Sequence, residues 1–294
     1  MIQKIIYRIK ALRLFSLPLS FSGIVMGGLL ANSFGNFSWA LFILAIITAS
    51  ALHLICNLAN DVGDYQSGND TAESVGHETM LISGKLSVRD LKLMIGFFTV
   101  IAALCGLALI YLAFGTIFEW RALLMIFVGV LSLLAAIFYT IGKKPYGYRA
   151  FGDLAVFLFF GLTAVAGTFF LLTKTLPAII LLPSISMGFF VTGVVNLNNI
   201  RDIENDRKYR KTIPIFIGEK NAKHYHALLV GLPFILMLYF NLIQQKPLTS
   251  YLYLILFPFT LYHILQVYNH KGLALNRAIG CLILITNFFV ISVV

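Results

Sequence analysis

The chain has 294 residues, of which 59% are hydrophobic and 12% are charged, and its formal net charge is +10. Soluble domains carry about 25% charged residues, so this composition excludes an ordinary soluble protein and predicts a single all-α membrane domain over 1–294. A basic excess is typical of the topology signals in membrane loops, and we therefore expect no nucleic acid among the partners.

The first fifteen residues, MIQKIIYRIKALRLF, place isoleucines at helical spacing with basic residues between them. This pattern predicts an amphipathic helix over 1–15 that lies on the membrane surface. A basic leader that only sets orientation is the alternative. No short apolar core with a small-residue cleavage site is present, so we expect no removable signal peptide.

The rest of the chain divides into apolar runs. Because a bilayer core about 30 Å thick needs roughly 20 apolar residues per helix, the sequence predicts nine transmembrane helices, over 16–34, 38–60, 91–114, 120–141, 151–172, 176–199, 224–243, 249–268 and 275–294. Two long polar loops, 61–90 and 200–223, contain most of the acidic residues. The three cysteines occur singly within apolar runs, so neither a disulfide framework nor a zinc site is expected.

The distribution of basic residues predicts the orientation in the membrane. Of the 22 Lys and Arg residues, only Arg121, Lys174 and Lys246 fall on the side opposite the N-terminus. Cytoplasmic loops carry the basic excess, so we expect the N-terminus and both long loops in the cytoplasm and the C-terminus outside. Among the 12 acids only Glu119 lies on the outer side, which argues against a proton or cation relay across the bilayer.

Two acidic stretches follow apolar runs. They are NLANDVGDYQSGND, from Asn57 to Asp70, and NLNNIRDIEND, from Asn196 to Asp206. In helical conformation the first would place Asn57, Asp61 and Asp64 on one face, and the second would stack Asn198, Asp202 and Asp206. The repeated N-L-x-N, four spans apart and on the same membrane side, predicts two pseudo-equivalent halves around one site.

Carboxylate and amide oxygens are the ligands that Mg²⁺ prefers. Two such clusters could hold two Mg²⁺ ions that clamp one diphosphate, and neither has the spacing of an EF-hand calcium loop. An acid just past a membrane helix can also be a solvated loop charge. That alternative is kept for Asp70, Glu73, Glu78 and Glu204.

A diphosphate also needs cations, and the same loops supply them. Arg201, which lies within the second acidic stretch, is the first candidate, followed by Lys143 and Lys144; most other basic residues are expected to determine topology or contact lipid head groups. An apolar bundle beside a diphosphate site indicates an isoprenoid diphosphate. Tyr139 could face the allylic cation left by its ionisation, although a tyrosine at this depth is often a membrane anchor.

At this point the sequence resembles the UbiA superfamily of intramembrane prenyltransferases over almost its whole length. The similar stretches are NLANDVGD at 57–64, YTIGKKPYGYRAFGD at 139–153, NLNNIRDIENDR at 196–207 and IGEKNAKHYHALL at 217–229. They are most similar to the branch that prenylates 1,4-dihydroxy-2-naphthoate in menaquinone synthesis. The resemblance implies a nine-helix bundle around a central cavity that opens to lipid, in the bacterial cytoplasmic (inner) membrane, with the active site facing the cytoplasm.

The resemblance also implies residue roles. Asn57, Asp61 and Asp64, with help from Asp70, would bind the first Mg²⁺ and diphosphate. Asn198, Asp202 and Asp206 would bind the second Mg²⁺. The prenyl diphosphate would also contact Tyr139, Lys144 and Arg201. Asp153 would position or deprotonate the aromatic acceptor, or it could equally be a helix N-cap or first-turn acid. Asn60, Asn199, Lys143 and Lys211 complete the candidate substrate-binding set.

Some positions depart from the family pattern. Arg13 precedes Leu14 where the family commonly has Arg-Pro. The first acidic stretch is followed by Gly76-His77-Glu78-Thr79, where the family often has Gly-Pro with an Arg two residues on. The family's Gly-Lys-x-Thr is shortened to Arg210-Lys211-Thr212. Lys85 or Lys211 could replace a missing cation. Other acceptors, such as 4-hydroxybenzoate, haem or a glycerol phosphate, are therefore alternatives, and a cation-coupled transporter or a non-catalytic scaffold are alternatives from other classes.

Overall fold

A computed structural model describes residues 2–68 and 79–293, and all the regular structure in these ranges is helical. The helices are α1 (Ile2–Ala11), η1 (Leu14–Ser16), α2 (Leu17–Ser33), α3 (Trp39–Ser67), α4 (Val88–Phe114), α5 (Trp120–Phe138), η2 (Tyr146–Tyr148), α6 (Gly152–Val156), η3 (Phe157–Gly167), α7 (Thr168–Thr173), η4 (Ala178–Ile180), α8 (Leu181–Arg201), α9 (Ile203–Asp206), α10 (Ile213–Ile217), α11 (Glu219–Ile243), η5 (Leu248–Leu256), α12 (Phe257–Asn269), η6 (Gly272–Leu275) and α13 (Asn276–Ile291).

The described residues contain nine helical segments long and apolar enough to cross a membrane. The predicted all-α membrane fold is confirmed, and each predicted span corresponds to one of these segments. The first runs from Gln3 to Ser33 and so includes the predicted surface helix. In that helix Lys4 lies 2.8 Å and Arg8 3.3 Å from the carboxylate of Asp90 in α4.

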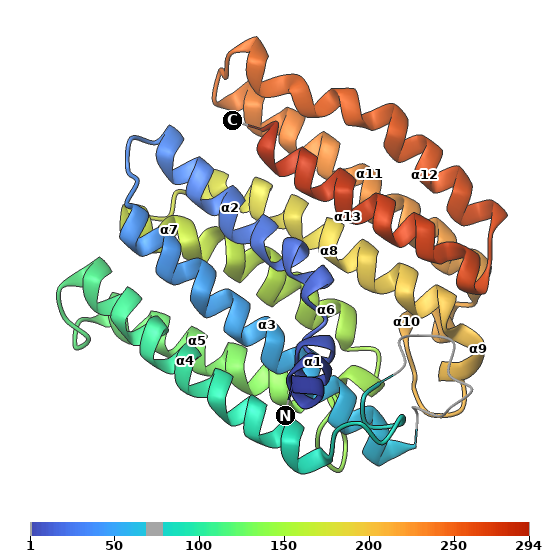
Figure 1. Cartoon of the computed structure of the whole chain (residues 1–294). Coiled ribbons are helices and arrows are strands. Elements are labelled where there is room, and N and C mark those ends of the chain that lie inside the picture. The colour runs from blue at the N-terminus through green and yellow to red at the C-terminus, as the bar shows by residue number, and fades with distance from the viewer. Residues whose placement is uncertain (1, 69–78, 294) are drawn as a thin grey trace.

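The helices form one bundle, with α3 and α8 near its centre (Figure 1). Helix α3 packs against α4, α5 and α2, whereas α8 packs against η3, α11 and α13. Figure 1 shows that α1, the C-terminal end of α3 and the short helix α9 share one end of the bundle, while the C-terminus lies at the other. The two acidic stretches are therefore brought to the same end.

Helix α3 is longer than the sequence predicted. It continues to Ser67 and ends at Gly68, whose φ of 73° is left-handed, a conformation that favours glycine. Asp61 and Asp64 therefore belong to the helix and not to the loop predicted from residue 61. The second predicted loop, 200–223, is interrupted by α9 and α10, and α11 already begins at Glu219.

An aromatic cluster fills the core between α8, α11, η5 and α13. Phe190, Phe234, Tyr253 and Phe289 are at most 3% exposed. The ring centroids of Phe190 and Phe289 are 4.8 Å apart, and the ring planes meet at 67° in an edge-to-face arrangement. Edge-to-face pairs of this kind add about 0.5–1.5 kcal/mol to the burial of each ring. This cluster fixes the C-terminal helices against α8.

The fifth span has an unusual helical register. Residues Phe157–Gly167 form a π-helix of 11 residues between α6 and α7. It approaches α8 so closely that a Cβ on Gly161 would lie 2.2 Å from the Cα of Gly188. The π-helix is rare and is frequently found at functional sites, and this one lines the central cavity described below.

Candidate active site

The first acidic helix face is held against the linker that joins α1 to α2. Asn57 donates from its amide nitrogen to the carbonyl oxygen of Leu12 at 3.1 Å and to Ser16 Oγ at 3.2 Å. Asp61, one turn further on, is 1% exposed and its carboxylate contacts the guanidinium of Arg13. A buried carboxylate is costly unless it is paired, and Arg13 supplies the opposite charge for Asp61.

The second acidic stretch keeps helical hydrogen bonding across the end of α8. The amide of Asp202 donates to the carbonyl of Asn198 at 3.0 Å, and that of Asp206 to the carbonyl of Asp202 at 2.9 Å. The i,i+4 stacking expected from the sequence is therefore present in the backbone. Arg201 donates to both carboxylate oxygens of Asp202, at 2.8 and 2.6 Å, and to Asn276 Oδ1 of α13 at 2.9 Å.

Arg210 joins the two stretches. Its guanidinium contacts the carboxylate of Asp64 and places Nε 3.7 Å from Asp206 Oδ1. Burial alone would lower the pKa of Arg210, but the two carboxylates raise it above its ordinary value. Burial raises the pKa of Asp206 to about 6, against the opposing effect of Arg210. The carboxylates of the two halves thus share one cation.

Tyr148 completes this junction. Its hydroxyl donates to the Asp64 carboxylate, and its ring lies under the Arg210 guanidinium at 4.7 Å. Burial and the neighbouring Asp64 charge raise the pKa of Tyr148, which keeps the hydroxyl protonated and able to donate. The backbone holds the two segments together, since the amide of Lys211 donates to the carbonyl of Tyr148 at 2.9 Å.

The remaining candidate residues are more scattered. Lys143, Lys144 and Lys211 have exposed side chains. Asn198 donates to Val194 of its own helix at 3.1 Å, Asn199 is half-buried, and Asn60 accepts from Thr140 Oγ1 at 3.2 Å. Asp70, Glu73 and Glu78 lie outside the described residues.

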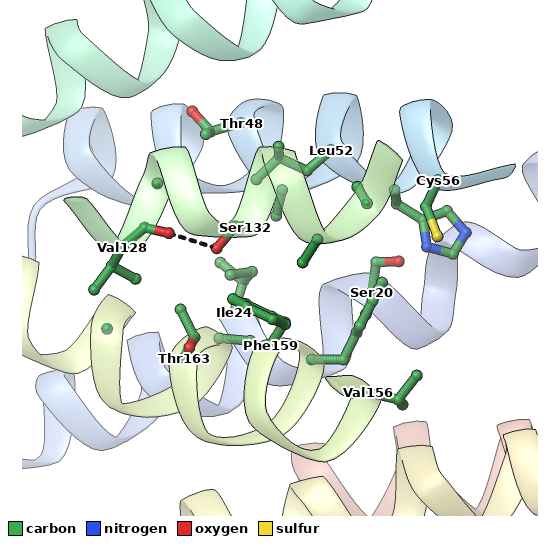
Figure 2. Close-up of a pocket in the computed structure, with 18 of the residues that line it drawn as sticks. Ser20, Ile24, Thr48, Leu52, Cys56, Val128, Ser132, Val156, Phe159 and Thr163 are labelled. Carbon is green, nitrogen blue, oxygen red and sulfur yellow. Dashed lines mark hydrogen bonds between the residues drawn. The ribbon is translucent and has the colours of Figure 1, made fainter. Parts of the chain in front are cut away.

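An apolar cavity of about 310 Å³ begins next to the first acidic face. Asn60, which precedes Asp61, and Tyr139 both line it, and its wall continues along α2, α3, α5 and η3. Figure 2 shows Cys56 and Ser20 at one end of this cavity and Val128 and Thr163 towards the other. The position of Cys56 and Asn60 on α3 identifies the first end as the one nearer the acidic residues.

Two glycines hold the ring of Tyr139 in place. A Cβ on Gly147 would lie 2.8 Å from Tyr139 Cε1, and one on Gly152 would lie 2.6 Å from the Tyr139 hydroxyl. Asp153, by contrast, lies outside the lining of this cavity. It is 4% exposed, and its backbone carbonyl accepts from Thr192 Oγ1 of α8 at 3.5 Å.

Sequence reasoning did not single out Arg13, Tyr148 or Arg210 as site residues. The sequence pattern places Arg13 in a predicted surface helix and Arg210 in the second polar loop. Each contact joins residues far apart in the chain, 48 positions for Arg13 and Asp61 and 146 for Arg210 and Asp64. A signal was nevertheless present, because Arg13 matches the arginine of the family's Arg-Pro pair and Arg210 begins the shortened stretch Arg210-Lys211-Thr212.

Comparison with known proteins identifies the family. The model of the UbiA prenyltransferase family matches residues 21–287. The 1,4-dihydroxy-2-naphthoate octaprenyltransferase of Escherichia coli K12 is 37% identical over 85% of this chain and 81% of its own length. The enzyme of the same name from Haemophilus influenzae is 35% identical over 86% and 82%.

Solved structures share the fold at low sequence identity. A UbiA homolog from Archaeoglobus fulgidus aligns over 97% of both chains with a TM-score of 0.68 and 17% identity. A UbiA homolog from Aeropyrum pernix K1 aligns over 96% of both chains with a TM-score of 0.67. An enzyme is therefore favoured over the transporter and the scaffold, and the chain belongs to the UbiA prenyltransferase family.

Proposed function

We propose that this protein transfers a polyprenyl group from polyprenyl diphosphate to 1,4-dihydroxy-2-naphthoate, with loss of the carboxylate, in the synthesis of menaquinone. The observation that carries the proposal is the junction at Arg210, where carboxylates from two acidic helix ends meet beside an apolar cavity. A charged head group and a long apolar tail require these two environments side by side. The names of the similar enzymes from Escherichia coli and Haemophilus influenzae support the choice of acceptor.

The donor set fits Mg²⁺. Within the described ranges no three His, Cys, Asp or Glu side chains converge on one metal position, and Mg²⁺ usually takes one or two carboxylates and completes its shell with phosphate and water. We assign one ion to Asn57, Asp61 and Asp64 and a second to Asn198, Asp202 and Asp206. The structure of a UbiA homolog from Archaeoglobus fulgidus bound to GPP and Mg²⁺ supports this class of ligand.

Bound Mg²⁺ would neutralise the charge that develops on the leaving diphosphate. The arginines then have a second role. Arg13, Arg201 and Arg210 are paired with the same carboxylates, and once those charges are matched by metal, the guanidiniums can donate to diphosphate oxygens. Arginine suits this task because its planar fork matches phosphate geometry.

In the reaction the bond between prenyl C1 and the diphosphate oxygen breaks, and diphosphate leaves with the bonding pair. The ring of Tyr139, at the acidic end of the cavity, stabilises the allylic cation, and the apolar walls exclude water. The acceptor ring forms a new carbon–carbon bond to C1. Its carboxylate leaves as CO₂ and returns its bonding pair to the ring, which gives demethylmenaquinone in its reduced form.

Asp153 has no direct place in this sequence, and we assign it a supporting role. Its side chain is buried in the first turn of α6, outside the lining of the cavity. The excess of Lys and Arg at the N-terminus and in the two long loops supports a location in the bacterial cytoplasmic membrane, with the active site facing the cytoplasm.

The test is a product assay. Purified protein in lipid nanodiscs with Mg²⁺ and labelled polyprenyl diphosphate is offered 1,4-dihydroxy-2-naphthoate, 4-hydroxybenzoate, haem or glycerol phosphate, and products are identified by mass spectrometry. We expect a prenylated, decarboxylated naphthol product only. Preferential prenylation of another acceptor would refute the proposed acceptor, and absence of any prenyl transfer would refute the proposed activity.

A further inference from the structure

Two buried polar atoms lie unsatisfied at the acidic end of the cavity. Ser20 of α2 is 5% exposed and His53 of α3 is 9% exposed, and both line the cavity. Within the described part of the chain, neither Ser20 Oγ nor His53 Nδ1 has a hydrogen-bond partner. An unpaired polar atom costs about 1–3 kcal/mol when it is buried, so two in one cavity wall indicate that a ligand supplies the missing partners.

The other nitrogen of the His53 ring decides which kind of partner is missing. His53 Nε2 lies 2.7 Å from Ser16 Oγ, and the same hydroxyl lies 2.8 Å from the carbonyl oxygen of Arg13. Two oxygens at that distance need a hydrogen between them, so the Ser16 proton points to the carbonyl. Ser16 Oγ must then accept from His53 Nε2–H.

An imidazolium would be costly in this buried, apolar wall, so the ring is neutral and its other nitrogen, Nδ1, carries a lone pair. The atom of the His53 ring that lacks a partner is therefore a hydrogen-bond acceptor. Its orientation is fixed on both sides, because Asn57 also donates to Ser16 Oγ at 3.2 Å and the imidazole packs edge-on against Phe160, with ring centroids 5.7 Å apart.

We propose that His53 and Ser20 hold a ring hydroxyl of the aromatic acceptor, with the hydroxyl donating to His53 Nδ1 and Ser20 Oγ–H donating to the hydroxyl oxygen. This inference rests on the proposed function. The two reactants differ in their hydrogen-bonding groups. The prenyl diphosphate has acceptor atoms on its ionised diphosphate and no hydrogen-bonding atoms on its chain, whereas a naphthol hydroxyl is both donor and acceptor. His53 and Ser20 are thus positioning residues for the acceptor.

The arrangement links acceptor binding to the first acidic face. Ser16 contacts both His53 and Asn57, which is one turn before Asp61 on α3. The short linker between α1 and α2 therefore fixes the His53 ring relative to the carboxylates, and hence the acceptor relative to prenyl C1. Holding two reactants in register contributes to the rate because it removes orientational freedom before reaction.

Two variants test the assignment. His53→Phe keeps the ring packing but removes both nitrogens, and with them the acceptor atom and the hydrogen bond to Ser16. Ser20→Ala removes one hydroxyl. For each we expect KM for the naphthoate to rise about tenfold, as for the loss of one buried hydrogen bond, while KM for polyprenyl diphosphate stays within about twofold. Ser184→Ala is the matched control, because this buried serine of α8 already donates to Ile180 at 2.8 Å.

Methyl ethers of the acceptor give a readout that a purely structural role would not change. The wild-type protein should discriminate against the 1-O-methyl or the 4-O-methyl ether by about tenfold or more in kcat/KM, and His53→Phe should lose that discrimination. An unchanged KM for the naphthoate in both variants, or discrimination that persists in His53→Phe, would overturn the inference while the proposed function stands. A wild-type protein that prenylates no naphthoate would instead overturn the proposed function, and this inference with it.

Discussion

Arg210 contacts the carboxylate of Asp64, a residue 146 positions earlier in the chain, and at the same time lies 3.7 Å from Asp206. The two acidic stretches thus meet through one guanidinium. Tyr148 supports both partners, because its hydroxyl donates to Asp64 and its ring lies under Arg210. In the absence of metal, this cation is what allows negative charges from the two halves to approach one another.

Replacing Arg210 should destabilise the metal-free protein more than the metal-bound one. Arg210→Ala leaves Asp64 and Asp206 without their shared cation, and breaking a buried pair costs about 3–5 kcal/mol. Mg²⁺ can substitute for the lost charge, so thermal unfolding in detergent should show a large fall in Tm without Mg²⁺ and a smaller fall at saturating Mg²⁺.

The control for Arg210 lies three residues earlier. Arg207 pairs with Glu204 at 3.5 Å, and both side chains are more than half exposed, so Arg207→Ala should cost no more than about 1 kcal/mol. Equal losses of Tm in the two variants, or a loss in Arg210→Ala that Mg²⁺ does not reduce, would contradict the role of Arg210 as the shared counterion.

The carboxylates assigned to metal should be essential. Asp61→Ala and Asp202→Ala each remove an oxygen ligand from one of the two clusters, and we expect kcat/KM for prenyl transfer to fall by more than about 100-fold, since metal-assisted charge stabilisation contributes several kcal/mol. Glu204→Ala is the control, because Glu204 belongs to the second acidic stretch but its side chain is 78% exposed. Near wild-type turnover in Asp61→Ala or Asp202→Ala would refute the two-metal assignment.

The parts of the fold that the sequence predicts correctly depend on local patterns. Hydropathy locates the nine spans because each must cross the bilayer on its own. Helical spacing groups Asn57, Asp61 and Asp64 on one face, although the predicted span ends at residue 60 and α3 continues to Ser67. The common position of the two acidic stretches follows from counting basic residues in the loops. These predictions need no knowledge of how the helices pack.

The features that escape prediction depend on tertiary packing. Nothing near Arg13 in the chain indicates that it reaches Asp61, and hydropathy cannot distinguish the π-helical register of Phe157–Gly167 from an α-helix, because apolar composition is the same in both. His53 is a single histidine in an apolar run, and its importance becomes visible only when Ser16 and the cavity are located around it.

The contact between Gly161 and Gly188 should be intolerant of side chains. A Cβ on Gly161 would lie 2.2 Å from the backbone of Gly188, so Gly161→Ala should push η3 away from α8 and cost about 1–3 kcal/mol. Thermal unfolding would measure this as a lower Tm. The control is Gly231→Ala in α11, where nothing lies within 4 Å of the added Cβ, and a helical alanine there should be neutral or stabilising by about 0.5–1 kcal/mol.

Ligand binding should couple Mg²⁺ to the prenyl diphosphate. Asp61, Asp64, Asp202 and Asp206 are all paired with arginines, so Mg²⁺ alone must compete with these guanidiniums. A diphosphate added together with Mg²⁺ gives the released guanidiniums new partners. We therefore expect Mg²⁺ and a non-hydrolysable prenyl thiolodiphosphate together to raise Tm by more than the sum of their separate effects, since each ligand that binds only the folded state stabilises it.

Chelation and mutation separate this coupling from simple detergent-like binding of the prenyl tail. EDTA should remove the combined increase in Tm, and Asp61→Ala should reduce it to the effect of the prenyl compound alone. A prenyl alcohol of the same length, which lacks the diphosphate, should give no Mg²⁺-dependent increase because it offers the guanidiniums no anionic oxygens. Additive shifts in the wild-type protein would mean that the metal and diphosphate sites are independent, and the carboxylates joined by Arg210 would then have to be assigned a structural role.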